Sequence, residues 1–273
     1  VLRAQGSVPA EGLRQAPELG FVARLAQNAT GATTYNGVLG IHRGVPELSI
    51  SSSLQGLGLS LPAPLNKPAE AVLPLRFSNV LLAESQTGPA GNARLRDQLQ
   101  LDLAGLASVA YVRDLSGSEP RVLRGSIAVG LAPGESAPMP AEGVVANINL
   151  ANVNFDAWGT ALAKAAGVPL VAPVAPAING PAALGYLPTV MAVRAAELTA
   201  GGRIFRSVVI GGGREDLTWR ANVSADQLNG YLEYRQPSPA GAGRVYARLA
   251  HLTIEPGAGA DVEAVLEQQP ASI

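Results

Sequence analysis

Apolar and polar residues alternate along most of this 273-residue chain, which is the period-2 pattern of strands that bury one face. The pattern is cleanest in two runs of leucine, where glycine, serine, glutamine or aspartate stand between the leucines. Such an alternation predicts a sheet with one apolar side and one solvated side. The leucines of these two runs are Leu57, Leu59, Leu61, Leu99, Leu101 and Leu103.

The same alternation predicts strands over most of the remaining length. Within residues 72–84 the apolar positions change parity, which predicts a β-bulge near Ser78 and Asn79. Besides the two leucine runs, strands are expected at residues 33–41, 48–50, 72–84, 109–114, 122–131, 144–155, 189–199, 203–210, 217–223, 228–234 and 244–254.

Two segments have helical patterning instead. Residues 17–28 place Phe21, Val22 and Leu25 on one stripe, and residues 156–166 have the composition of a helix. Asn154 or Asp156 can cap the first free amides of the second segment. The expected fold is therefore mainly β, with two short helices.

Proline suggests where the chain divides. Residues 168–185 are rich in valine, alanine and proline, which excludes an interior strand and predicts an extended loop or lid. We therefore expect an N-terminal β-rich segment at residues 1–167 and a C-terminal β-repeat segment at residues 186–254. Residues 255–273 are expected to be a tail cut from a longer chain, with helix-forming composition near residues 262–268.

Composition agrees with an all-β interpretation. Hydrophobic residues make up 47% of the chain but aromatic residues only 4%, so burial depends on Leu, Val, Ala and Ile on many short strands. Taken alone, the alternating faces fit the interior of a sandwich or barrel. The formal net charge of −1 gives no long-range field to gather phosphates, so a nucleic-acid partner is not expected.

The sequence carries few groups for chemistry. It has no cysteine, and His42 and His251 have no carboxylate at metal-ligand spacing, so we expect no metal, no cofactor and no catalytic residue. Carboxylates such as Glu215 and Asp216 leave a hydrolase of envelope polymers open in principle only, because nothing places an acid beside a base. Trp158 and Trp219 sit within apolar patterns and are expected to be packing anchors.

Three stretches resemble a known family. Residues 51–69 run from Ser-Leu-x-Gly into Leu-Pro-Ala-Pro-Leu-x-Lys-Pro-Ala, and this segment resembles the YhdP branch of the AsmA-like family of bacterial envelope proteins. The stretch NVNFDAW at residues 152–158 and the repeat-like residues 196–252 are similar to the same branch. The resemblance spans roughly the whole chain and identifies it as an internal fragment of such a protein.

The resemblance implies a particular use for the alternating faces. It implies a curled antiparallel sheet, like a taco shell, that forms an elongated apolar groove shielding phospholipid acyl chains between inner and outer membranes. The six leucines of the two runs would line this groove. The expected partners are these acyl chains, a membrane that is reached through segments outside this sequence, and other envelope proteins. The resemblance also implies that the chain lies in the periplasm, as part of a protein anchored in the inner membrane of a Gram-negative bacterium. The alternative is a structural or interaction β-domain, a sandwich or spacer, without lipid binding.

Overall fold

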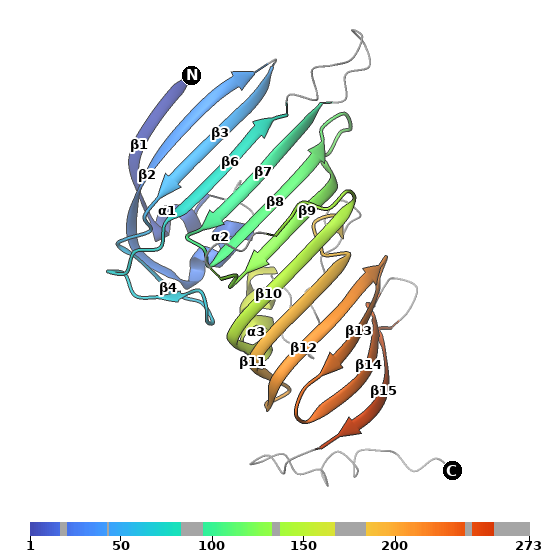
Figure 1. Cartoon of the computed structure of the whole chain (residues 1–273). Helices are drawn as coiled ribbons and strands as arrows, with labels where there is room; N and C mark the ends of the chain where they lie inside the picture. The colour runs from blue at the N-terminus through green and yellow to red at the C-terminus, as the bar shows by residue number, and fades with distance from the viewer. Residues whose placement is uncertain are drawn as a thin grey trace.

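The fold is one long, curled β-sheet (Figure 1), seen in a computed structural model that describes residues 1–16, 21–42, 44–82, 95–132, 137–166, 184–237 and 242–253. The mainly β fold with a curled open sheet is thus confirmed. The strands are β1 (Leu2–Pro9), β2 (Ala29–His42), β3 (Val45–Ser52), β4 (Leu57–Ser60), β5 (Asn66–Lys67), β6 (Leu75–Leu81), β7 (Arg96–Leu103), β8 (Ala107–Asp114), β9 (Arg121–Val129), β10 (Gly143–Asn154), β11 (Val190–Ala200), β12 (Arg203–Glu215), β13 (Thr218–Ser224), β14 (Leu228–Arg235) and β15 (Arg244–Leu252).

The strand order follows the chain with few exceptions. From β15 back to β6 each strand lies beside its sequence neighbour, then β3, β2, β4 and β5 follow, and β1 pairs with β2. The expectation of a fully antiparallel sheet is wrong at one place, because β10 runs parallel to both β9 and β11. Parallel neighbours need a crossover connection, and the chain supplies one on each side of β10.

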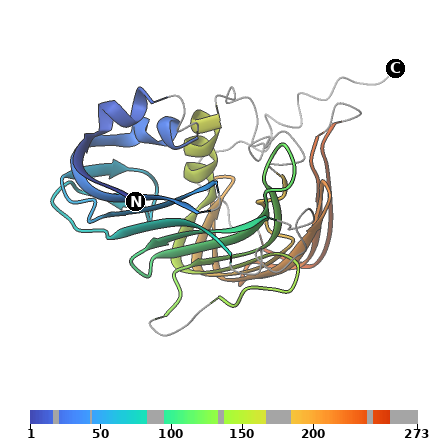
Figure 2. The ribbon, with the colours of Figure 1, turned by 90° about the horizontal axis from the view of Figure 1, so that it is seen from above.

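The described parts of the two crossovers lie on opposite faces of the sheet. The β9–β10 connection packs on the convex face, where Ser126 Oγ donates to the carbonyl of Ala137 at 3.0 Å. The β10–β11 connection begins with helix α3 (Phe155–Ala166), which lies on the concave side (Figure 2). Of the predicted loop or lid at residues 168–185, residues 168–183 lie outside the described residues. The segment boundaries at residues 167 and 186 stay a prediction, although β10 and β11 are neighbours in one sheet.

The predicted bulge at Ser78 and Asn79 is wrong. Strand β6 pairs without interruption with β3 and with β7 through these residues. The apparent change of parity arises because Val80 is an exposed apolar residue on the polar face, not because the strand is irregular. Register shifts occur instead between Val112 and Arg113 and between Asn229 and Gly230.

Three short helices and one 3₁₀ turn are present in the described part of the chain: α1 (Ala10–Arg14), α2 (Phe21–Leu25), the turn Ala26–Asn28, and α3. Of the expected helix at 17–28, the part from residue 21 onward is confirmed as α2 and the turn, and residues 17–20 lie outside the described residues. Helix α1 and strand β1 were not expected. Strand β1 alternates Leu2, Ala4, Gly6 and Val8 with polar residues, but its small residues give a weak apolar signal.

The helix at residues 156–166 is confirmed as α3, and its cap is Asn154. The side-chain Oδ1 of Asn154 accepts a hydrogen bond from the backbone N–H of Ala157 at 2.9 Å. Asp156 instead receives the backbone N–H groups of Gly201 and Gly202 at 2.8 and 2.9 Å, which fixes the β11–β12 turn to the start of the helix. No helix in the described part of the chain is long and apolar enough to cross a membrane.

Replacing the cap, Asn154→Ala, is expected to lower the free energy of unfolding by about 1 kcal/mol, because it leaves a helix N–H group without its acceptor. Urea denaturation measures this loss. The matched control is Asn152→Ala, two residues earlier on β10, whose exposed side chain makes no hydrogen bond among the described residues. Equal losses in the two variants would show that the cap contributes nothing specific.

Candidate functional site

The most distinctive feature is a face of the sheet that is apolar on nearly every strand; we call it the apolar face. Register defines it, because residues directly opposite each other on paired strands point to the same side. Leu101 of β7 lies opposite Phe77 of β6 and opposite Val109 of β8. Followed strand by strand, the face includes Leu2, Leu39, Leu48, Ile50, Leu75, Phe77, Leu99, Leu101, Leu103, Val109, Ile127, Val144, Ala146, Ile148, Val193, Ala195, Val208, Ile210, Ala221, Val223, Leu232, Ala247 and Leu249.

The opposite, convex face has a different composition on the same strands. Its residues are mostly charged or amide and hydroxyl side chains. They include Arg3, Gln5, Asn36, Ser49, Ser51, Arg76, Ser78, Gln98, Gln100, Asp102, Arg124, Asn147, Asn149, Arg194, Arg220, Asn222, Glu233, Arg244 and Arg248. The sheet therefore has an apolar side and a polar side, and on the polar side Val112, Ser126 and Ala128 are buried.

The apolar face is unevenly covered. In the middle of the sheet its residues are buried, with Val144 only 1% and Val208 only 2% exposed. Toward the first and last strands they are open, with Leu2 65% and Val245 71% exposed. The face thus passes from a packed centre to two open margins.

The predicted leucines fall into two groups. Leu99, Leu101 and Leu103 lie side by side on the apolar face of β7, each partly exposed. Leu57, Leu59 and Leu61 lie elsewhere, on and just after β4, which pairs with the first residues of β2. Leu57 is 4% exposed and packs with Ala10 and Ala29, so it belongs to a small closed core. The structure therefore does not bring the two leucine runs onto one surface.

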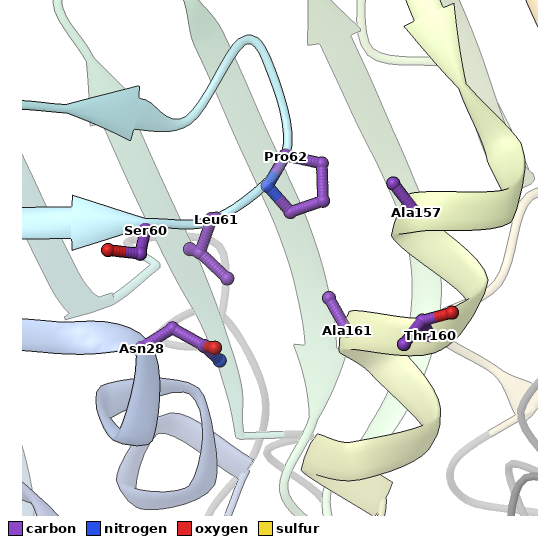
Figure 3. Close-up of a pocket in the computed structure, with 7 residues that line it drawn as sticks. All are labelled: Asn28, Ser60, Leu61, Pro62, Ala157, Thr160 and Ala161. Atoms are coloured by element: carbon purple, nitrogen blue, oxygen red, sulfur yellow. The ribbon is translucent and has the colours of Figure 1, made fainter.

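That small core belongs to a cap at one end of the concave side. Helices α1, α2 and α3 gather there with β4 (Figure 2). Trp158 of α3 donates its indole N–H to the carbonyl of Ala63 at 2.8 Å, which ties the helix to the loop after β4. Between these parts lies a cavity of ≈ 380 Å³ (Figure 3). Its lining is neutral: Asn28, Ser60, Leu61, Pro62, Ala157, Thr160 and Ala161.

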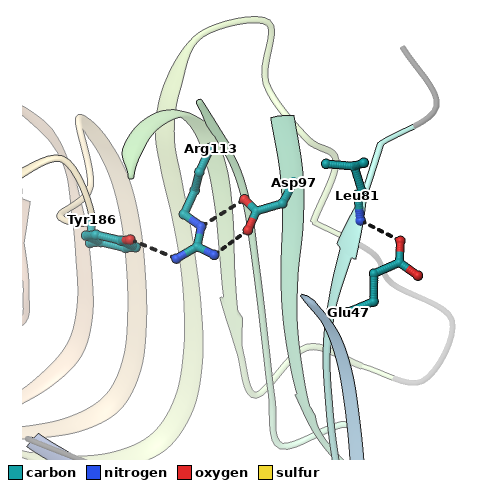
Figure 4. A network of polar contacts seen from close by, with 5 residues as sticks. All are labelled: Glu47, Leu81, Asp97, Arg113 and Tyr186. Atoms are coloured by element: carbon teal, nitrogen blue, oxygen red, sulfur yellow. Dashed lines mark hydrogen bonds and ion pairs between the residues drawn. The ribbon is translucent and has the colours of Figure 1, made fainter. Parts of the chain in front are cut away.

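Polar side chains interrupt the apolar face near the start of β7 and the end of β8. Asp97 of β7 is 1% exposed and is bound by the guanidinium of Arg113 through two hydrogen bonds, one of them 3.0 Å long from Nε to Oδ1. Arg113 also donates to the hydroxyl of Tyr186 at 3.3 Å (Figure 4). The hydrogen bonds to Asp97 raise the pKa of Arg113 above its usual range. Sequence alternation gave no sign of this pair, because its two members are polar residues on the apolar side.

Tyr111 completes this network. Its hydroxyl donates to the backbone carbonyl of Tyr186 at 2.9 Å, and the two rings meet edge to face with centroids 5.1 Å apart. Burial is the main cause that raises the pKa of Tyr111 to about 12, with a smaller contribution from Tyr186. The segment before β11 is thereby fastened to β8 at this end of the concave side.

The raised pKa of Tyr111 predicts a pH dependence. Because the folded pKa is about 12 and that of an unfolded tyrosine is about 10, the folded state favours the neutral phenol. This contribution to stability is complete below pH about 10 and is lost as the pH rises toward 12. An absorbance titration of tyrosinate should show a late step that disappears in Tyr111→Phe. If the difference between the titrations of the unchanged protein and of Tyr111→Phe is centred near pH 10, the burial of this hydroxyl is contradicted.

A second arginine fastens the same segment from β12. Arg214 donates to the backbone carbonyls of Leu184 and Pro188 at 2.9 and 3.2 Å, and its guanidinium lies 5.7 Å from the ring centre of Trp219. Burial lowers the pKa of Arg214. Trp219 is thus covered by an arginine, whereas Trp158 anchors a helix.

The described residues contain no cluster of three or more His, Cys, Asp or Glu that could hold a metal ion. His42 lies on the convex side, 3.4 Å from Glu47, and Glu47 also accepts the backbone N–H of Leu81 at 3.0 Å (Figure 4). Glu215 and Asp216 are exposed near a turn, and Glu215 pairs with Arg220 at 2.8 Å. The candidate functional site is therefore the apolar face of the sheet.

Comparison with known proteins gives one family. The family model described as YhdP protein matches residues 1–272, nearly the whole chain. Searches of the curated proteins and of the solved structures gave no match.

Proposed function

This chain belongs to the YhdP family, and we propose that it is a periplasmic segment of an AsmA-like envelope protein that shields phospholipid acyl chains during transport between inner and outer membranes. In this proposal the apolar face holds the chains, and the membrane is reached through segments outside this sequence. The parent protein would be anchored in the inner membrane of a Gram-negative bacterium and could contact other envelope proteins. No cofactor and no chemical step are needed.

The observation that carries the proposal is the continuity of the apolar face from β1 to β15. In a closed β-sandwich a second sheet packs over the apolar face, so that this face can be only as wide as the sheet that covers it. Here the described strands form one curled sheet, and the apolar face stays open at both margins. Exposed contiguous apolar surface of this kind marks a binding surface more often than an ordinary exterior.

The free-energy cost of exposing a lipid to water supports an apolar carrier. A phospholipid has roughly 30 methylene groups, and each costs about 0.8 kcal/mol when it is exposed to water. Moving a bare lipid through water would therefore cost on the order of 25 kcal/mol. A dry face removes most of this barrier, while the head group stays hydrated and needs no buried counter-charge.

A second candidate, a structural or interaction β-domain, is favoured by the middle of the sheet. Val153, Ala195, Leu198 and Val208 form a buried cluster against Leu150 and Phe205, as a closed core would. In this view the apolar face is covered throughout and serves only folding. The two candidates differ at β7, where the leucines are only partly covered.

The test is a photo-crosslinking side chain placed at Leu101 in the protein expressed in cells, followed by mass spectrometry of the captured lipid. The matched control is the same probe at Gln100, the next residue, which points to the convex face. Lipid capture at 101 and not at 100 supports the proposal. A folded protein that captures no lipid at 101, and carries none in a native mass spectrum, favours the structural domain.

A further inference from the structure

Residues 184–188, which precede β11, are held from β8 at one end of the concave side. The hydroxyl of Tyr111 donates to the backbone carbonyl of Tyr186 at 2.9 Å, and the two rings meet edge to face. Arg113 donates to the hydroxyl of Tyr186 at 3.3 Å and is itself bound by Asp97 of β7 (Figure 4). The segment is therefore connected to two neighbouring strands, β7 and β8.

Strand β9 allows this connection to pass over it. Tyr111 lies directly opposite Gly125 of β9, and a Cβ atom on Gly125 would collide with the Tyr111 ring. A glycine inside a strand often marks a place where another group approaches the backbone closely. The ring of Tyr111 therefore lies over β9, where a larger residue would exclude it, and meets Tyr186.

The same segment is held from the opposite direction by Arg214 of β12. The guanidinium of Arg214 donates to the backbone carbonyls of three residues at 2.9, 3.4 and 3.2 Å, which are Leu184, Leu187 and Pro188. It also lies 5.7 Å from the ring centre of Trp219 on β13, a cation–π contact. Three carbonyls bound by one side chain fix the path of the segment as well as its position.

The two sets of contacts join strands that are not neighbours. Strands β9, β10 and β11 stand between β8 and β12, a distance of about 19 Å along the sheet. On a curled sheet a link across the concave side is shorter than the path along the sheet, so it would have to stretch if the sheet flattened. The ladder hydrogen bonds alone do not set the curl, because neighbouring strands are rotated relative to each other by anything from about 10° to 35°.

We propose that residues 184–188 act as a brace that fixes the curl of the sheet between β7 and β13, and with it the width of the concave side. The brace has two anchors in series, the tyrosine anchor (Tyr111 with Tyr186) and the arginine anchor (Arg214). Loss of either anchor breaks the link between β8 and β12, and the two margins of the sheet then move apart. The inference does not depend on lipid binding.

The chain has no cysteine, so two spin labels can be placed on the whole 273-residue protein and the distance between them measured by pulsed electron paramagnetic resonance. Leu39→Cys on β2 and Leu249→Cys on β15 provide the attachment sites. Both positions lie on the apolar face at opposite margins, where the leucines are 39% and 37% exposed. Because both labels are on the concave side, opening of the curl lengthens the distance between them.

Cutting either anchor should give this lengthening. We expect Tyr111→Ala with Tyr186→Ala, or Arg214→Met alone, to increase the distance between the labels by at least about 5 Å, one strand spacing. Combining the two cuts should increase it no further, since a link in series is broken only once.

Matched controls come from the convex face. Tyr231 and Tyr246 form a second edge-to-face pair there, with ring centroids 6.5 Å apart, and Arg220 pairs with Glu215 and Glu233. Tyr231→Ala with Tyr246→Ala, and separately Arg220→Met, remove the same residue types without touching the brace. These controls should leave the distance between the labels unchanged.

Far-ultraviolet circular dichroism shows whether each variant stays folded, and if the tyrosine cut unfolds the protein, Arg214→Met alone decides. The proposal is overturned if the folded brace variants keep the original distance or if the convex-face controls lengthen it equally. It is also overturned if the two cuts add, because the contacts would then act separately and not as one brace.

Discussion

Leu101→Asp is expected to reduce the phospholipid carried by the purified protein by roughly 10- to 100-fold while the protein stays folded. Burying a leucine side chain contributes about 1.5–3 kcal/mol, and each 1.4 kcal/mol is a factor of ten in affinity. Leu101 lies between Phe77 and Val109 on the apolar face and is only partly covered. A carboxylate there would be unpaired beside the acyl chains, where a charge is strongly disfavoured.

The matched control for this prediction is Gln100→Asp. Gln100 is exposed on the convex face of the same strand, so the same charge should change neither lipid content nor stability. Lipid extracted per mole of protein and a urea denaturation curve measure both quantities. If Leu101→Asp unfolds the protein by more than about 4 kcal/mol, the position is closed core, and the proposal of an open binding face is wrong there.

The sequence predicted the sheet well because period-2 alternation depends on local residues alone. The strand at residues 109–114 and the run 228–234 appear as β8 and β14 within two residues of their expected ends. The parallel placement of β10 was missed because alternation looks the same in parallel and antiparallel strands. The direction of β10 relative to its neighbours is set by its two crossover connections, one around Ala137 and one through α3.

The position of one leucine run could be predicted for a similar reason, while a role of these leucines in lipid binding stays a prediction. Alternation identifies which residues share a face, so Leu99, Leu101 and Leu103 lie together. It gives no information on which strands become neighbours, and Leu57 and Leu61 proved to be buried in the end cap. Likewise Asp97 and Arg113 are 16 residues apart and meet only because β7 and β8 pair.

The largest loss of stability is expected from Asp97→Ala. This change leaves the guanidinium of Arg113, whose side chain is 13% exposed, without its carboxylate. Removing one partner of a buried ion pair costs about 3–5 kcal/mol, because the remaining charge stays desolvated. The matched control is Glu215→Ala, which breaks the exposed pair with Arg220 and should cost less than about 1 kcal/mol. Urea denaturation compares the two variants.

A double variant distinguishes two causes of lost stability: the unpaired buried charge of Arg113 and the loss of packing. Asp97→Leu with Arg113→Leu removes both charges, and replacing a whole buried pair by apolar residues is often close to neutral. We therefore expect the double variant to regain most of the stability that Asp97→Ala loses, although Tyr186 then loses one hydrogen bond. The pair would then be a device that fixes the segment before β11 over β8 and not a net source of stability. If Asp97→Ala costs no more than Glu215→Ala, water reaches Arg113 and the network does not close this end of the concave side.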